Sequence, residues 1–171
     1  NITMALRNYN KALSMEPVRA DIHLQKLNLL MQEKRKEEAV EAAGLMIANC
    51  PDYYEGYHLK CGLLLEADKF AEAETVLAQG LEMFPEEVGF QIDQAKILAA
   101  RRKYAEAEAK LVGLEENPGS WKREILMERI RVAGLQEDFE KTTLLLEKAY
   151  AECRAEDGTP DEEICYLLMR V

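Results

Sequence analysis

The feature that most constrains this chain is a repeat of about 34 residues, an interval within the range of stacked supersecondary units. It is marked by prolines, at Pro17, Pro51, Pro85 and Pro118. The first three are evenly spaced, and the last comes one position early. The segments KFAEAE at 69–74 and KYAEAE at 103–108 are near copies at the same interval. A fixed interval of this length indicates units that pack mainly against their neighbours.

Each period predicts two amphipathic helices joined by a short polar turn. In residues 54–85, Tyr57, Cys61 and Leu64 share one face of a first helix. The polar stretch 67–69 ends that helix. The second helix has its own apolar face, formed by Phe70, Ala73, Leu77 and Leu81. Pro85 ends the unit because proline restricts the preceding residue and cannot continue a helix.

Small residues stand where helices must approach closely. Cys61, Ala73 and their counterparts Ala95 and Ala107 are expected to be buried, since larger side chains would force the helices apart. The chain has only five prolines and nine glycines, which also favours helix throughout.

These positions resemble the tetratricopeptide repeat family. The best match is residues 54–85, through Tyr57, Cys61, Leu64, Phe70, Ala73, Leu77, Gly80 and Pro85. Residues 88–118 follow through Ala95, Leu98, Tyr104, Ala107, Leu111 and Pro118. Residues 20–51 depart from the pattern at Leu27, in place of a small residue, and at Lys36, in place of an aromatic one. Residues 123–153 form a degenerate unit that lacks the closing proline.

The resemblance implies an all-α, right-handed superhelical solenoid of antiparallel helix pairs. We expect one repeat domain over residues 1–171. Its parts would be a half unit at 1–19, units at 20–53, 54–87, 88–120 and 121–158, and the start of a further unit at 159–171. Because both ends fall inside a unit, the chain is expected to be a piece of a longer protein. Ser120 is a candidate cap for the helix that follows it, and Thr159 is predicted as N-cap with Pro160 at the first helical position.

Charge and cysteine usage limit the function classes. Lys and Arg total 22 against 32 Asp and Glu, a formal charge of −10 and a pI near 4.8. This acidic balance argues against nucleic acid and against anionic membrane surfaces. The four cysteines lack the spacing of a metal or redox motif. No apolar run approaches the length that crosses a bilayer. The expectation is a soluble, cytoplasmic protein with free thiols.

No pattern predicts catalysis, a cofactor or a metal. The two histidines, His23 and His58, lie on the first helices of successive units and form no metal-binding motif. The acid pairs Glu72/Glu74 and Glu106/Glu108 alternate with alanines on a helix, so they are interpreted as a solvated outer face. There is no phosphate-binding glycine loop or nucleophile elbow. The chain is therefore predicted not to be an enzyme.

The expected work is to bind a protein or peptide. In such a stack the first helices line a concave groove. The candidate partner-binding residues are Leu24, Asn28, Met31, His58, Leu59, Leu65, Glu66, Ile92, Asp93, Lys96, Met127 and Arg131. This mixture of apolar and acidic residues would suit an amphipathic helix or an extended peptide with basic flanks. Trp121 is a further candidate contact, or else a staple for its own helix.

Some tetratricopeptide proteins hold chaperone tails through a Lys/Asn/Arg carboxylate clamp. By resemblance, only Asn28 matches that clamp, because Leu24, Leu59 and Asp93 replace its other members. This chain is therefore not expected to bind such tails. Two alternatives to peptide binding stay open: a structural element that self-assembles through exposed end helices such as 164–169, giving a homo-oligomer, and a regulatory repeat domain of a larger enzyme.

Overall fold

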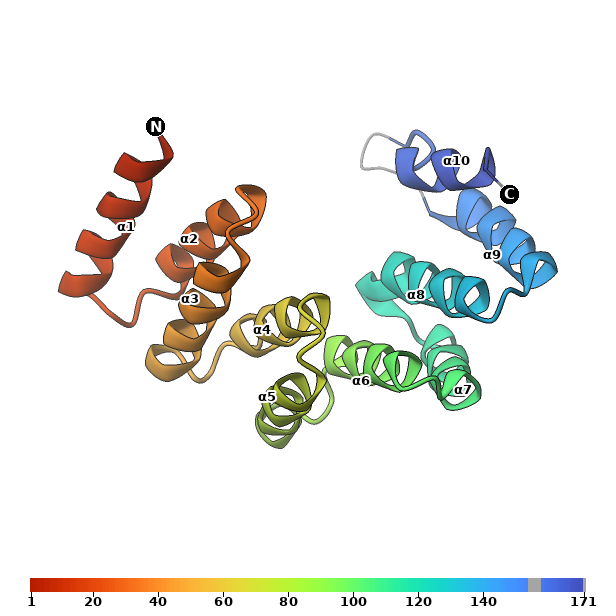
Figure 1. The fold of residues 1–171 in the computed structure, drawn as a ribbon, viewed down its shortest axis with the longest axis horizontal. Helices are drawn as coiled ribbons and strands as arrows, with labels where there is room; N and C mark the ends of the chain where they lie inside the picture. Colours follow the sequence, from red (N-terminus) through yellow and green to blue (C-terminus); the bar gives the residue numbers. More distant parts are fainter. Residues whose placement is uncertain (154–157, 171) are drawn as a thin grey trace. The chain divides into compact units, whose positions relative to one another are not determined.

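The computed structural model describes residues 1–153 and 158–170, and most of them are helical (Figure 1). The helices are α1 (Ile2–Met15), α2 (Ala20–Gln32), α3 (Lys36–Asn49), α4 (Tyr54–Glu66), α5 (Phe70–Met83), α6 (Val88–Ala100), α7 (Tyr104–Glu115), a 3-10 turn (Gly119–Trp121), α8 (Lys122–Leu135), α9 (Phe139–Glu152) and α10 (Glu162–Leu168). No residue between 20 and 118 lies in a strand. The all-α prediction is confirmed.

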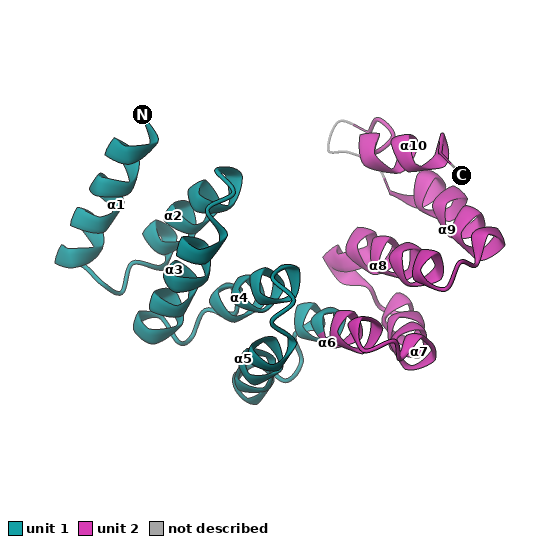
Figure 2. Ribbon diagram, in the orientation of Figure 1, with its two compact units in different colours: residues 1–93 teal, residues 94–171 magenta. Residues whose placement is uncertain are grey.

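The chain divides into two compact units, Asn1–Asp93 and Gln94–Val171 (Figure 2). The first unit holds α1 to α5 and the start of α6. The second holds the rest of α6 and α7 to α10. Each unit is described here by itself.

The turn inside each helix pair has the same backbone geometry. One residue takes a positive φ: Lys34 at 57°, Asp68 at 56°, Arg102 at 60° and Glu137 at 57°. In each turn the next N–H donates to a carbonyl of the first helix, as from Arg35 to Leu30 and from Lys69 to Leu64. This bond satisfies an end carbonyl of the first helix and starts the second helix directly. The same turn therefore joins the two helices of each of these pairs.

Each unit has its own core. In the first, Leu6, Leu27, Leu30, Ala39 and Leu63 belong to a buried cluster of α1 to α4. In the second, residues of α8, α9 and α10 form a cluster, which consists of Leu126, Ile130, Ala133, Leu145, Leu146, Ala149, Cys153 and Ile164. The small residues Cys61, Ala73, Ala95 and Ala107 are all 0% exposed. Their predicted burial is confirmed.

Two predicted caps are wrong. The N-cap of α10 is Asp161, whose Oδ1 accepts from the N–H groups of Glu163 and Ile164 at 3.0 and 3.2 Å. Thr159 and Pro160 precede the helix, because the carboxylate of Asp161 reaches those N–H groups instead. Ser120 lies within the 3-10 turn, and α8 starts after Trp121 without a side-chain cap.

Candidate partner-binding surface

The candidate residues repeat at matching positions of the first helices. On α2 they are Leu24, Asn28 and Met31, at the i, i+4 and i+7 spacing of one helix face. On α4 the same positions, one repeat later, hold His58, Gly62 and Leu65. On α8 the first two of them hold Met127 and Arg131. In the first unit, this face is the part of α2 and α4 that the core leaves at least partly open.

Side-chain exposure separates the candidates into three groups: exposed, half-buried and buried. Asn28 is exposed, and Met31 is 37% exposed. Glu66 and Arg131 are also exposed. The half-buried candidates are Leu24, His58, Leu59, Leu65, Lys96 and Met127.

Two candidates on α6 do not fit an exposed groove. Ile92 is 1% exposed and Asp93 is 0% exposed. The expectation that the Asp93 carboxylate would meet a basic peptide therefore needs correction, since its side chain is enclosed by the protein.

Asp93 has a partner inside its own unit. Nδ1 of His58 on α4 donates to Oδ2 of Asp93 on α6 at 2.7 Å. The histidine side chain is 20% exposed and the carboxylate 0%, so the histidine helps to enclose the carboxylate. A buried carboxylate is costly unless it is hydrogen-bonded, so the pair joins α4 to α6. The sequence placed both residues on first helices but did not predict that they touch.

The exposed acidic and basic candidates also have partners. Nζ of Lys36, at the start of α3, lies 2.9 Å from Oε2 of Glu66. Both side chains are well exposed, so this pair stabilises the fold little and a ligand can replace it. Arg131 is held by Glu128 of its own helix, and Nε of Arg131 lies 2.8 Å from Oε1 of Glu128.

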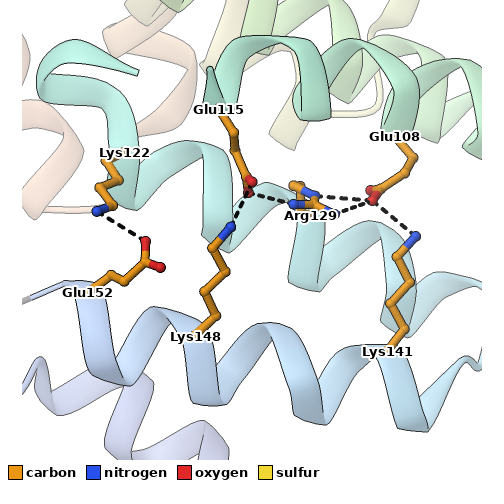
Figure 3. Close-up of polar contacts among 7 residues, drawn as sticks. All are labelled: Glu108, Glu115, Lys122, Arg129, Lys141, Lys148 and Glu152. Carbon is orange, nitrogen blue, oxygen red and sulfur yellow. Dashed lines mark hydrogen bonds and ion pairs between the residues drawn. The ribbon is translucent and has the colours of Figure 1, made fainter. Parts of the chain in front are cut away.

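A cluster of ion pairs that the sequence did not predict joins α7, α8 and α9 (Figure 3). Arg129 lies between two carboxylates, with Nη2 2.7 Å from Oε1 of Glu108 and Nη1 2.5 Å from Oε1 of Glu115. Lys141 and Lys148 of α9 approach the same carboxylates at 3.0 and 2.8 Å. We call these five residues the Arg129 network.

The network corrects the interpretation of Glu106 and Glu108 as a solvated pair. Glu106 is exposed and pairs with Lys103, as a surface acid does. Glu108 is only 15% exposed and Arg129 only 12%, because both side chains lie between α7, α8 and α9 (Figure 3). Residues two apart point to different sides of a helix, so one acid faces solvent and the other faces the neighbouring helices.

The remaining chemistry is limited. Among the described residues no group of three or more His, Cys, Asp or Glu side chains could hold a metal ion. All four cysteines are free thiols, and burial raises the pKa of Cys50 and Cys153. Within the described ranges, no helix combines the length and apolar character needed to cross a bilayer.

Comparison with known proteins agrees with the fold. A sequence model of the tetratricopeptide repeat family matches residues 63–120. A tetratricopeptide repeat protein from Parabacteroides merdae is similar in structure, with a TM-score of 0.81 and 17% identity over 98% of this chain. This chain spans 63% of the length of that protein. No curated protein matches the sequence.

Two further solved structures share the fold. TTC0263, a tetratricopeptide protein of Thermus thermophilus, has a TM-score of 0.75 and 15% identity, over 99% of this chain and 89% of its own. YrrB, described as a tetratricopeptide protein with an unusual peptide-binding site, has a TM-score of 0.60 and 18% identity, over 99% of this chain and 84% of its own.

The fold is thus an α-solenoid of helix pairs, the class that carries protein-interaction surfaces on stacked repeats. The tetratricopeptide repeat model matches residues 63–120, and the similar structures show that the chain as a whole has the tetratricopeptide fold.

Proposed function

We propose that this chain is a non-catalytic interaction module that binds a peptide or helix of a partner protein along its first helices. The observation that carries the proposal is the matching face of α2 and α4. Both helices bury their opposite sides in the core, as Leu27 and Leu64 show, at 0% exposure each. The open face keeps Met31, Leu65 and Asn28 at least partly accessible.

This face suits an apolar anchor with basic neighbours. Met31 and Leu65 occupy the same position in successive pairs and offer flexible apolar contact, which accepts varied side chains. Glu66 stands beside Leu65, and its ion-pair partner within the described part of the chain is the exposed Lys36. A basic side chain of a ligand can displace that lysine at small cost. The description of YrrB as peptide-binding supports the same class of ligand.

A peptide selection tests the proposal. Random peptides displayed on phage would be selected on this chain, and the affinities of selected peptides measured by calorimetry. We expect Met31→Ala and Leu65→Ala to weaken binding by about fivefold or more each, because anchor residues at interface centres cost over about 1 kcal/mol. Glu66→Lys should weaken peptides that carry lysine or arginine, most strongly at low salt.

The matched control is Met83→Ala, which truncates a methionine that is 49% exposed on α5, a second helix. It should leave affinity unchanged. Selected peptides that bind Met31→Ala and Leu65→Ala as tightly as the parent chain would refute a first-helix site. A mass that rises with concentration in light scattering without peptide would instead favour self-assembly. In the 164–169 segment, Ile164 is buried and Leu167 and Leu168 pack on the core cluster of the second unit, so Tyr166 and Met169, at 54% and 78% exposure, would have to carry that contact.

A further inference from the structure

A second surface, separate from the first-helix face, is a cleft between α1, α2 and α3. Its volume is about 400 Å³, and its walls combine apolar and charged side chains. The apolar part includes Leu6, Leu30 and Leu45. Leu6 and Leu30 are buried, whereas Leu45 is 52% exposed at the rim.

The cleft is lined by more cationic than acidic side chains. Arg35 binds Glu38 through two contacts, from Nε to Oε1 at 2.6 Å and from Nη2 to Oε2 at 2.7 Å. Arg7 and Lys26 also line the cleft, and neither side chain pairs with an acidic group among the described residues. Glu41 is the other acid of the lining and makes no ion pair with them. Three cations and two acids give this cleft a net positive charge on a chain whose formal charge is −10.

In the second unit, α7, α8 and α9 follow one another as α1, α2 and α3 do in the first. There, the cation at the position of Lys26 forms ion pairs. Helices α3 and α9 have equal length, 14 residues each, and each follows a first helix after the same kind of turn. When α3 is aligned with α9, Lys26 of α2 corresponds to Arg129 of α8. Arg129 is enclosed by two carboxylates of α7 (Figure 3).

Those carboxylates have no counterpart on α1, the helix that holds the place of α7 beside the cleft. Alanines mark the common position on the second helices, one repeat apart, at Ala5, Ala39, Ala73 and Ala107. On α1 the residue after this alanine is Leu6, and on α7 it is Glu108. Two turns further along each helix, Leu13 takes the place of Glu115. Lys26 therefore occupies the central position of the network without either acid, and Arg7 adds a second positive charge beside it.

We infer that the α1–α2–α3 cleft binds an acidic segment of a partner protein, whose Asp or Glu carboxylates lie between Arg7 and Lys26. The ligand supplies the negative charge that Glu108 and Glu115 supply within the second unit. Its apolar side chains contact Leu6 and Leu45. The site is independent of the proposed first-helix site, which favours basic residues, so one partner with acidic and basic parts can engage both.

The test uses two blocked peptides, acetyl-EELEELEE-amide and its counterpart with Gln for every Glu. Binding is followed by NMR titration of the isotopically labelled chain at low ionic strength. We expect the Glu peptide to shift amide signals of α1, α2 and α3 and to bind at least about fivefold more tightly than the Gln peptide. Added NaCl should weaken binding of the Glu peptide. Equal affinity of the two peptides, or shifts confined to other helices, would overturn the inference.

Two variants probe the cations directly. Lys26→Gln removes the central charge and should weaken the Glu peptide by about fivefold. Arg7→Glu puts a carboxylate on the wall beside the position that Glu108 holds in the network, so it should abolish peptide binding and raise the melting temperature by pairing with Lys26. Unchanged affinity in both variants would contradict the site.

Matched controls come from the same chain. Lys60→Gln changes the lysine at the position of Lys26 in the next pair, which is also half-buried but outside the cleft. Lys11→Glu reverses a charge on α1 outside the cleft. Both should bind the Glu peptide like the parent chain, as should Met31→Ala. A loss as large in Lys60→Gln or Lys11→Glu as in Lys26→Gln would mean that net charge alone drives binding. Binding of an oligothymidylate in place of the Glu peptide would also refute an acidic protein ligand.

Discussion

The ring of Phe90 on α6 fills the space beside Gly80 on α5. A Cβ on Gly80 would stand 2.7 Å from Cζ of Phe90 and 2.8 Å from Cε1. Phe90 is 0% exposed, and its ring contacts Tyr54 edge-on and Phe84 at a tilt, with centroids 6.4 Å away in both cases. The ring cannot move aside, so the family's small residue at this position is required here by one aromatic side chain.

Gly80→Ala should therefore destabilise the chain. Overpacking against Phe90 costs about 1–3 kcal/mol, and the better helix propensity of alanine returns about 1 kcal/mol of it. Urea unfolding measures the difference. The matched control is Gly62→Ala on α4, where nothing lies within 4 Å of the new Cβ. That variant should be stabilised by about 0.5–1 kcal/mol, and equal effects of the two substitutions would contradict the contact.

Removing the central cation of the Arg129 network should be costly. Arg129→Gln leaves Glu108 and Glu115 covered by α8 and α9 with only the lysines near them, and we expect a loss of roughly 3 kcal/mol. Lys103→Gln is the control, because it breaks an ion pair with Glu106 in which both partners are more than half exposed. It should cost under about 1 kcal/mol. Similar losses in both variants would show that burial of the network does not strengthen it.

Stability should fall in acid partly through Asp161. A hydrogen bond from Arg123 lowers the pKa of Asp161 more than burial raises it, and the N–H of Ile164 lowers it further. A carboxyl group with a lowered pKa in the folded state stabilises the fold above its unfolded pKa, which is about 3.9. That contribution disappears as the pH falls through the folded pKa.

Asp161→Asn tests this assignment. Asparagine still caps a helix but has no charge to lose, so the variant should lose less stability than the parent chain when the pH drops from about 6 to about 3. Asp138→Asn is the control, since Asp138 caps α9 through the N–H of Lys141 and forms no ion pair with an arginine among the described residues. An identical pH profile for Asp161→Asn and the parent chain would contradict the role of the charge.

The four thiols should react at different rates. Cys61 is 0% exposed and Cys50 and Cys153 are 6% exposed, and burial raises the pKa of the last two, which keeps them protonated. Cys165 on α10 is half-buried. Ellman's reagent should modify Cys165 first in the native chain and the other three only on unfolding. Cys165→Ser should remove the fast phase, and a fast phase that persists would place the reactive thiol elsewhere.

Much of the fold could be read from local signals. The prolines after α1, α3 and α5, the alanines that recur once per repeat and the helical spacing of apolar residues each act within one helix or between adjacent helices. In a stacked repeat, most contacts are of this short-range kind, so a one-dimensional pattern carries the information. The turn residues with positive φ, such as Lys34 and Glu137, were not predictable by type, because glycine or asparagine is the usual signal there.

The sequence by itself determined the helix pairs, their interval and the small residues at their contacts. Only the tertiary structure decided which charged side chains are enclosed. Glu106 and Glu108 look alike in sequence, yet one faces water and the other faces Arg129. Lys26 and Arg129 hold one position in two repeats, yet only Arg129 meets carboxylates. The environment of a side chain depends on which residues the neighbouring helices bring to it, and that is a property of three helices together.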